Sequence, residues 1–568
     1  MPTPIFKKPA YDENTLQCLA TACGISRVTA GALLCRGFLS AEDVAAFLQI
    51  DGRRVFNPFL LPDMEAAVER LERAAEAGEK IAVFGDYDAD GVTATTLLYT
   101  YFSERGFPVS YYIPSRLEEG YGMNEAAVRR LAAEGVTLIV TVDCGVACHR
   151  EVELARELGV DVIVTDHHEC PPELPDAVAV IDPKRPDSAY PFSELAGVGV
   201  AFKLVSALEG ESEIPALLAR FSDLVAVGSL ADVVPLLSEN RILVQLGLNV
   251  LRHSPRQGLK VLLESSRSTD KPLTATDLTF TVVPRINAAG RMGDASIGVE
   301  LLLTEDGTKA TELAEELCRI NESRRAAEQE ILKEAEALLE ANPPHSGTIC
   351  VLAHEGWHPG VLGVVAARLC DAYHTPFLLL TIEDGEAKGS GRSVDGISLY
   401  EALFAVREHI KQFGGHAQAV GLTVKEEKLD DLRDALNRVC SIQAPPVSEY
   451  AIDYIAKTNE LTVPVARELL QLEPFGAGNP APQIGVFDAT VTEIRAVGVD
   501  GKHLKLRVKD SGGTMDCIGF CMGELSTELL LGMQVDLIGE LEENEFRGRS
   551  APQLRLKAIR RCDDGKTV

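Results

Sequence analysis

The chain has 568 residues, so it is too long for one hydrophobic core, and its length favours about three to four domains. Its 46% hydrophobic and 25% charged residues are typical of a globular protein, and it shows neither a continuous apolar run of membrane-spanning length nor the basic-then-apolar start of a signal peptide. The 13 cysteines have no CxxC spacing, which argues against a disulfide framework or a zinc ribbon and favours reduced thiols in the cytoplasm.

The net charge of −30 argues against a nucleic-acid partner, because proteins bind phosphates mainly through lysine and arginine. Net charge is nevertheless an average over the whole surface. A cleft that gathers arginines and divalent cations still accepts a polyanion, so the charge leaves both classes of partner open.

The first 75 residues predict a helical, alanine-rich lead-in with a last helix over residues 64–77. From residue 80 onward, strand and helix signals alternate. The pattern predicts strands at 81–85, 109–113, 136–142 and 160–165, with helices from 92 to about 104 and over 124–133. This alternation is typical of a doubly wound α/β domain with a parallel sheet.

Acidic and imidazole side chains follow these predicted strands: Asp86, Asp88 and Asp90 after the first, Asp143 after 136–142, and Asp166-His167-His168 after 160–165. A further apolar run at 225–231 predicts a fourth strand of this kind, which ends on Asp232. Because ligands bind at the carboxyl ends of parallel strands, we expect these side chains to meet in one crevice.

The chemistry of these side chains favours a metal site over a set of solvated turn aspartates. Asp88, Asp90, Asp143 and Asp232 supply hard oxygen, which suits Mg²⁺, and the imidazole of His167 shifts the preference toward Mn²⁺. So many carboxylates indicate two ions, and a pair about 3.5–4 Å apart can polarise a phosphate and generate a hydroxide nucleophile. His168 is expected to point away from His167 toward a substrate phosphate, the alternative being a buried core histidine.

Four stretches, residues 86–91, 143–145, 166–168 and 231–232, resemble the successive motifs of the DHH phosphoesterase superfamily. Within it, the chain is most similar to the RecJ-type single-strand-specific DNA exonucleases, and residues 284–293 also resemble a RecJ-type motif. Arg291 in that glycine-flanked turn suits phosphate capture, because a guanidinium pairs with two oxygens. Some relatives carry a histidine four residues before the second aspartate of the first motif. Phe84 stands there in this chain, so the resemblance implies one metal with fewer protein ligands.

Regularly spaced apolar residues among many charges predict a long connecting helix over residues 309–342, which Asn342-Pro343-Pro344 would end. Residues 343–445 then predict a second α/β domain. Its stretch at 389–393 (Gly-Ser-Gly-Arg-Ser) is expected to form a turn that holds a terminal phosphate. Together with Gly414-Gly415-His416 this stretch resembles the DHH-associated domain. The resemblance implies substrate-binding roles for Ser390, Arg392, His416 and, in the first domain, Arg116.

Two further histidines of the second domain, His354 and His358, are close enough in sequence to suggest a metal pair. Gly356 and Pro359 argue against the helical spacing that such a pair needs, so structural roles are favoured for both.

Five strand-like runs near the end of the chain predict an OB-type barrel: 483–491, 503–509, 514–521, 533–540 and 553–560. The last part of the barrel contains the most basic patch of the sequence, with Arg547, Arg549, Arg555, Lys557, Arg560 and Arg561. Phe520 and Phe546 suit either stacking platforms for bases or core positions of the barrel.

We therefore expect a lead-in (1–75), a DHH catalytic domain (76–308), a connecting helix (309–342), a DHH-associated substrate-binding domain (343–445) and an OB-type nucleic-acid-binding domain (450–568). The resemblance implies a metal-dependent 5′-to-3′ exonuclease that hydrolyses single-stranded DNA to mononucleotides in DNA repair and recombination. It also implies a cytoplasmic monomer without membrane contact, which acts with a single-strand-binding protein and a helicase.

Two other functions compete with this one. A small-substrate DHH phosphodiesterase, acting on short oligonucleotides or cyclic dinucleotides, would have no need of the barrel. A non-enzymatic DHH-fold scaffold would be marked by loss of the motif carboxylates, and the sequence retains them. The sequence leaves Asp86 open as either a turn residue or a ligand.

Overall fold

The computed structural model describes residues 4–253, 255–266, 272–341, 348–439, 449–546 and 548–562. The chain divides into two compact units. The first comprises Gly52–Val234 and Ile242–Pro446, and the second combines Met1–Asp51, Pro235–Arg241 and Val447–Val568. The described cysteines are free thiols, in line with the absence of paired spacing in the sequence.

The first unit contains the predicted parallel sheet, in the strand order β3-β2-β4-β5-β6. Its strands are β2 (Ile81–Gly85), β3 (Val109–Tyr112), β4 (Leu138–Val142), β5 (Asp161–Thr165) and β6 (Ala179–Ile181). β2 and β4 are buried at every position, because helices cover both faces of the sheet, and their sequences are accordingly continuous apolar runs. α6 (Glu125–Ala133) and α7 (His149–Glu157) share a core cluster with Ala82 and Phe84, while α5 (Ala89–Glu104) and α8 (Gly197–Glu209) also pack on the sheet.

The apolar run before Asp232 is helical, so the predicted fourth strand is wrong. It forms the last part of α9 (Ile214–Ala231), and Asp232 is the C-cap of that helix. Every residue from Phe221 to Leu230 is buried, and a helix buried on all sides has the same uninterrupted apolar sequence as a buried strand.

Two segments of the described chain resemble membrane spans in length and apolar composition. Glu211–Ala231 is one of them, and 72% of its apolar window is buried inside the protein. The other consists of α1 (Glu13–Cys23) and α2 (Arg27–Cys35) taken together, but these two helices meet at a bend of 112°.

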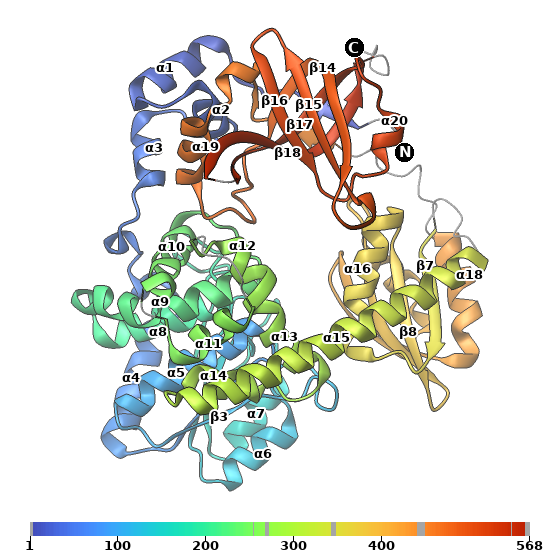
Figure 1. Ribbon diagram of the computed structural model, residues 1–568. Coiled ribbons are helices and arrows are strands. Elements are labelled where there is room, and N and C mark those ends of the chain that lie inside the picture. Colours follow the sequence, from blue (N-terminus) through green and yellow to red (C-terminus); the bar gives the residue numbers. More distant parts are fainter. Residues whose placement is uncertain are drawn as a thin grey trace. The chain divides into compact units, whose positions relative to one another are not determined.

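A long helix, α15 (Gly307–Ala341), packs at one end on helices of the first domain and at the other on α16 (Leu362–Tyr373) of the second (Figure 1). The predicted end of this helix at 342–344 lies outside the described residues. The other helices of the first domain are α4 (Met64–Ala77), α10 (Ser238–His253), α11 (Gln257–Ser266), α12 (Ala275–Asp277), the π-helix η4 (Leu278–Val282), α13 (Val283–Met292) and α14 (Ser296–Leu303).

The second domain is a mixed sheet in the order β10-β11-β9-β8-β7. Its strands are β7 (Cys350–Glu355), β8 (Phe377–Glu383), β9 (Glu386–Arg392), β10 (Gln412–Gly415) and β11 (Ala419–Lys425), and its other helices are α17 (Leu399–Ala405) and α18 (Leu429–Val439). The turn predicted at 389–393 is wrong, because residues 389–392 belong to β9. Glycine serves close packing there: a Cβ on Gly389 would come within 1.9 Å of the Leu379 carbonyl oxygen on β8.

In the second unit, segments from both ends of the sequence share one core. β1 (Ile5–Lys7) pairs in parallel with β12 (Glu449–Ala451). Apolar residues of α1, α2 and α3 (Ala41–Leu48) belong to the same core cluster as those of the barrel strands. The N-terminal helices before residue 52 therefore fold with the C-terminal part of the chain.

The predicted five-stranded barrel is confirmed. Its strands are β14 (Ile484–Val497), β15 (His503–Asp510), β16 (Gly513–Gly519), β17 (Gln534–Phe546) and β18 (Arg549–Arg561), and pairing of β14 with β17 closes the ring. β13 (Tyr454–Ile455), α19 (Val463–Leu469) and α20 (Leu525–Glu528) complete this part. Closure leaves no free edge among the five strands.

Four of the five basic residues of β18 pair with carboxylates, so they do not form the free cationic surface expected from the sequence, whereas the fifth, Arg549, is exposed. Arg555 and Lys557 pair with Glu540, Arg560 lies 2.6 Å from Asp536, and Arg561 lies 3.5 Å from Glu528. The first three pairings follow from antiparallel register, which sequence spacing does not reveal, because it sets β18 beside the acidic β17.

Phe520 lies at the surface of the barrel. Phe520 is 54% exposed, so it is not a core residue, and its ring lies edge-on to His503 with centroids 5.3 Å apart. The side chain of Phe546 and the whole of Arg547 lie outside the described residues.

Arg241 is a buried cation that ties three segments of the second unit together. It donates hydrogen bonds to the carbonyl oxygens of Phe47 (3.1 Å), Leu472 (2.8 Å) and Gln471 (3.3 Å), and burial lowers its pKa to about 10.

Arg241→Met would leave these buried acceptors unpaired, at a cost of about 1–3 kcal/mol each before relaxation. We expect faster amide hydrogen exchange across residues 41–49 and 463–473. The exposed ion pair of Arg467 is the matched control, and Arg467→Met should change exchange little. Unchanged hydrogen exchange in Arg241→Met would show that Arg241 does not hold these segments together.

Candidate active site

Loops at the carboxyl ends of neighbouring strands bring the predicted metal ligands together. Asp86 and Asp88 follow β2, Asp143 follows β4, and His167 follows β5. The possible ligand atoms form three groups in which all atoms lie within 4.8 Å of one another: Asp86–Asp88–Asp143, Asp143–His167–His168 and Asp90–His167–Asp232. Because Asp143 and His167 each belong to two groups, the predicted ligands form one continuous cluster.

Close helix packing sets the positions of two of these carboxylates. Asp90, in the first turn of α5, accepts hydrogen bonds from the backbone N–H groups of Gly197 (2.7 Å) and Val198 (2.9 Å) at the start of α8. A Cβ on Gly197 would come within 2.6 Å of the Asp143 Cβ, and one on Gly228 within 2.6 Å of Asp90 Oδ1. Glycine at these positions therefore lets α8, which contains Gly197, and α9, which contains Gly228, approach the two carboxylates.

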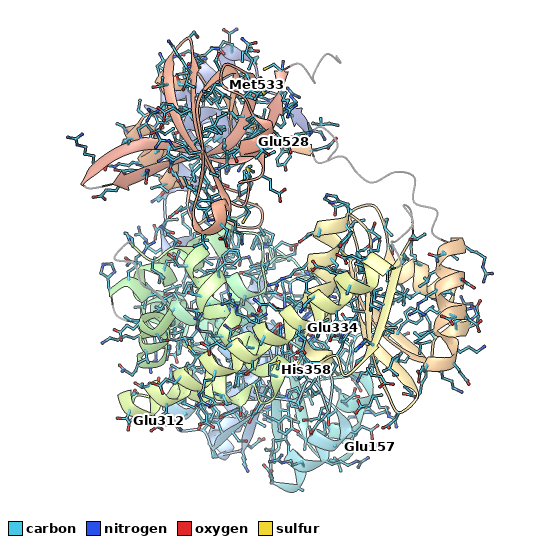
Figure 2. All side chains as sticks on the ribbon, turned by 45° about the vertical axis from the view of Figure 1, so that its right-hand side comes forward. Glu157, Glu312, Glu334, His358, Glu528 and Met533 are labelled. Carbon is cyan, nitrogen blue, oxygen red and sulfur yellow. The ribbon has the colours of Figure 1, made fainter. Side chains whose placement is uncertain are left out.

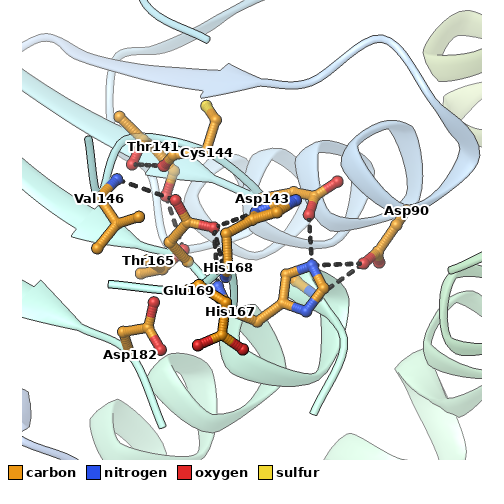
Figure 3. Close-up of polar contacts among 12 residues, drawn as sticks. Asp90, Thr141, Asp143, Cys144, Val146, Thr165, His167, His168, Glu169 and Asp182 are labelled. Carbon is orange, nitrogen blue, oxygen red and sulfur yellow. Dashed lines mark hydrogen bonds and ion pairs between the residues drawn. The ribbon is translucent and has the colours of Figure 1, made fainter. Parts of the chain in front are cut away.

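His167 lies at the centre of the cluster (Figure 3). Its Nε2 is 3.0 Å from Asp143 Oδ1 and 4.0 Å from Asp90 Oδ2, and its Nδ1 is 3.6 Å from Asp232 Oδ2. Nε2 is buried and is not aligned for a hydrogen bond with any described residue. An imidazole nitrogen that faces carboxylates without hydrogen-bonding to them has the arrangement of a co-ligand of a cation.

The electrostatics of the cluster fit divalent cations. Burial and the charges of neighbouring carboxylates raise the pKa of Asp86, Asp90 and Asp143 well above the ordinary value, and that of Asp232 to about 6. Burial, aided by the charge of the neighbouring histidine, lowers the pKa of His167 to about 3, so its ring is neutral and a lone pair is available. The buried Asp86 Oδ1 also has no hydrogen-bond partner within the described part of the chain. Such crowded acceptors need positive charge between them.

His168 does not point away from His167, so that expectation is wrong. The two ring centroids are 4.5 Å apart, because the chain bends after Asp166 and does not continue the strand. The His168 side chain is 40% exposed, which also rules out a buried core histidine. Burial acts to lower its pKa, but the hydrogen bond between its Nδ1 and Asp166 Oδ1 (2.7 Å) and the charge of Asp166 raise it to about 9.

A group of arginines lies beside the carboxylates. Arg116 follows β3, Arg291 lies in the last turn of α13, and Arg392 ends β9, and none of them pairs with a carboxylate of the described chain. Burial and then the charge of Arg116 lower the pKa of Arg392, and the same causes lower that of Arg291 to about 10. Partly buried guanidiniums that repel one another indicate an anion site.

The other predicted substrate-binding residues differ in their placement. Ser390 Oγ accepts a hydrogen bond from Arg392 Nη1 (3.1 Å), so these two side chains are joined. Arg291 belongs to a helix and not to the predicted glycine-flanked turn, because Pro284 occupies the first helical turn, where its missing N–H is tolerated. His416 is exposed in the hairpin between β10 and β11, and no hydrogen bond within the described chain joins its ring to the arginines.

Three residues that build the site were given no role by sequence reasoning. Asp166 orients His168, the Tyr121 hydroxyl donates to the Asp143 carbonyl oxygen (3.1 Å), and Asn287 Oδ1 accepts from the Ala89 N–H (2.7 Å). The sequence signal for Asp166 is its place as the first residue of the motif at 166–168. Asn287 lies within the RecJ-type motif at 284–293, but its contact with Ala89 and that of Tyr121 with Asp143 span long sequence separations, so neither residue could be given a role from the local sequence.

Phe84, which replaces a histidine found in some relatives, supplies nothing to the cluster. Its buried ring stacks on Tyr112, with centroids 5.2 Å apart, in the core under α6 and α7. The side chain therefore faces away from the carboxylates that follow β2.

His354 and His358 have the structural roles that the sequence favoured. His354 stacks on Trp357, whose indole N–H donates to Glu334 on α15 (2.7 Å), and His358 Nδ1 accepts from the Gly360 N–H (3.2 Å). Figure 2 labels Glu334 and His358. Within the described chain the two histidines do not form a group with metal-ligand geometry.

Comparison with known proteins agrees with this architecture. Family models match the DHH family N-terminal domain at residues 80–229, the DHHA1 domain at 346–441 and the RecJ OB domain at 452–558. The single-stranded-DNA-specific exonuclease RecJ of Bacillus subtilis (strain 168) is 39% identical over 553 residues, which are 96% of this chain and 69% of the relative.

Solved structures give the same result. The crystal structure of RecJ from Thermus thermophilus in complex with Mn²⁺ matches with a TM-score of 0.84 and 32% identity, covering 99% of this chain and 80% of that one. Its complex with Mg²⁺ matches with a TM-score of 0.79 and 30% identity, covering 98% and 79%. The expected DHH-type, DHH-associated and OB-type architecture is confirmed.

Proposed function

Since the chain belongs to the RecJ family of single-stranded-DNA-specific exonucleases, we propose that it removes mononucleotides from the 5′ end of single-stranded DNA in DNA repair and recombination. It is a hydrolase that acts on single-stranded DNA. The observation that supports the direction is the group of three unpaired arginines beside the carboxylate cluster. A terminal phosphate is the part of a strand that such a group recognises, because it carries more charge than a phosphodiester and has more free oxygens.

The residues of the cluster have distinct proposed roles. Two divalent cations, Mn²⁺ or Mg²⁺, would be held by Asp88, Asp90, Asp143, His167 and Asp232, with Asp86 close enough to Asp88 and Asp143 to assist. When bound, such ions neutralise the carboxylates and stabilise the charge that develops on the scissile phosphate.

His168 and the arginines act on the substrate directly. His168 carries a proton at neutral pH and is held by Asp166, so it can donate a hydrogen bond to a phosphate oxygen. Arg116, Arg291 and Arg392, with the Ser390 hydroxyl, bind the 5′ phosphate and fix the register of the strand. His416 is proposed to contact the strand farther along, because it is exposed in the same domain.

Digestion of a long single strand labelled at its 3′ end tests this function. With Mn²⁺ or Mg²⁺, removal of nucleotides from the 5′ end gives labelled products that shorten with time, whereas chelator stops the reaction. A matched duplex should survive, and a strand with a 5′ hydroxyl should react more slowly. Immediate release of the label as a mononucleotide would show the opposite polarity. Survival of the long strand while dinucleotides are hydrolysed would favour a small-substrate phosphodiesterase, and inactivity on both would favour a scaffold.

The family resemblance also supports three proposals about context. The protein is proposed to be a cytoplasmic monomer, to act with a single-strand-binding protein and a helicase, and to be organised in the domains expected from the sequence, except that residues 1–51 fold with the barrel and not as a separate lead-in. Sedimentation of the purified chain tests the monomer, since a mass of twice 61.3 kDa would contradict it. Co-sedimentation with each purified partner tests the association, and limited proteolysis tests the domain boundaries.

A further inference from the structure

The ring of Tyr87 lies beside the anion site, although its neighbours Asp86 and Asp88 belong to the metal cluster. The guanidinium carbon of Arg116 is 5.1 Å from the centroid of this ring. A separation below about 6 Å is typical of a cation–π contact. Arg116 makes no ion pair with a carboxylate of the described chain, although the charge of Asp86 attracts it, and the aromatic face of Tyr87 adds a direct contact that stabilises its charge.

The turn that carries Tyr87 is fixed by contacts with α13. A Cβ on Gly290 would come within 2.3 Å of the Tyr87 carbonyl oxygen, so glycine allows the helix to touch the turn. Asn287, on the same helix, accepts the hydrogen bond from the Ala89 N–H. The helix that carries Arg291 therefore also fixes the support of Arg116. Burial and the charge of Asp86 raise the pKa of Tyr87 to about 12, so its phenol stays neutral.

Arg116 needs such a support because its neighbours repel it. Its charge is a cause of the lowered pKa of both Arg291 and Arg392, so the three guanidiniums interact unfavourably before an anion binds. An unsupported Arg116, in the loop after β3, would turn away into solvent. Ordering the Arg116 side chain in the site would then cost conformational entropy when the substrate binds, and this cost weakens binding.

We propose that Tyr87 is a positioning residue whose ring holds Arg116 beside Arg291 and Arg392, ready for the 5′ phosphate of the strand. This inference rests on the proposed function and adds a residue to it. It predicts that the aromatic ring of Tyr87, and not its hydroxyl, contributes to preference for a phosphorylated 5′ end.

The test compares kcat and KM for strands with a 5′ phosphate and a 5′ hydroxyl in four variants. Tyr87→Leu should raise KM for the phosphorylated strand about tenfold, the size of a partly desolvated cation–π contact, and change kcat less than about twofold. It should leave the hydroxyl strand nearly unaffected. Tyr87→Phe, which keeps the ring, should resemble the wild type. Combining Tyr87→Leu with Arg116→Ala should cost no more than Arg116→Ala alone, because the two residues act together.

Two results would overturn the inference: equal loss in Tyr87→Phe and Tyr87→Leu, or an equal fall of kcat on both strands. A changed midpoint for Mn²⁺ binding in Tyr87→Leu would also overturn it, because the side chain would then act through the neighbouring carboxylates. Should the leucine variant not fold, Tyr87→Met undergoes the same comparison. Failure of the proposed function looks different: wild type and Arg116→Ala would then treat the two strand ends alike.

Discussion

Replacing Asp143 with asparagine is expected to abolish nuclease activity while leaving the fold intact. Asp143 shares two of the three ligand groups, and its Oδ1 lies 3.0 Å from His167 Nε2. Asparagine keeps the shape of the side chain but removes the negative charge that holds a cation. We expect kcat on single-stranded DNA to fall roughly a thousandfold, beyond the roughly 10–100-fold cost of losing a residue that only supports a ligand.

The measurement is initial-rate digestion of a labelled single strand at saturating Mn²⁺. Asp371→Asn is the matched control, because Asp371 lies exposed on α16 of the same unit, and its rate should equal that of the wild type. If Asp143→Asn keeps a tenth of the wild-type rate or more, Asp143 is not a metal ligand and the proposed site is wrong.

Adding Mn²⁺ to metal-free protein is expected to raise the unfolding temperature of the first unit by several degrees. A ligand that binds only the folded state at a hundredfold excess over its Kd stabilises that state by about 2.7 kcal/mol. The gain arises because the cations offset the burial and the mutual repulsion that raise the pKa of Asp86, Asp90 and Asp143. Trp357, the single tryptophan of the chain, is buried in this unit, so its fluorescence follows the transition.

The Asp143→Asn variant separates this effect from general salt stabilisation. Without metal it should unfold at a slightly higher temperature than the wild type, since one of the repelling buried charges is gone. It should also gain much less from Mn²⁺. An equal gain in both proteins would place the stabilising cation elsewhere.

Much of the first domain was predictable because its signals are local. Short apolar runs such as 81–85 and 138–142, alternating with helical segments, are typical of buried parallel strands, and parallel order brings the residues after them together. The cluster of Asp88, Asp143 and His167 therefore followed from the sequence. The placement of Asp232 could not be predicted. α9 is buried on every side, so its apolar residues follow one another without the helical spacing that identifies a helix.

Other parts depend on contacts that a sequence does not display. Gly389 and Gly391 suggested a turn. In the structure they lie in β9, where the absence of a side chain allows a neighbouring strand and neighbouring side chains to pack closely. The basic residues of β18 suggested a cationic surface until the register with β17 set Glu540 and Asp536 beside them. Arg116, Arg291 and Arg392 were recognised through family resemblance, and their mutual repulsion appears only in three dimensions.

The joint core of residues 1–51 and the barrel has a consequence for synthesis on the ribosome. The Tyr11 hydroxyl donates to the Asp453 carbonyl oxygen, 442 positions later, and β1 pairs with β12. At roughly 5–20 residues per second, the N-terminal helices must wait about 20–90 s for their partners to emerge. The sequence of the first unit is synthesised during that time, and the apolar faces of α1 and α2 remain uncovered throughout it. α1 and α2 are thus exposed to chaperones and proteases until the barrel strands have emerged to cover them.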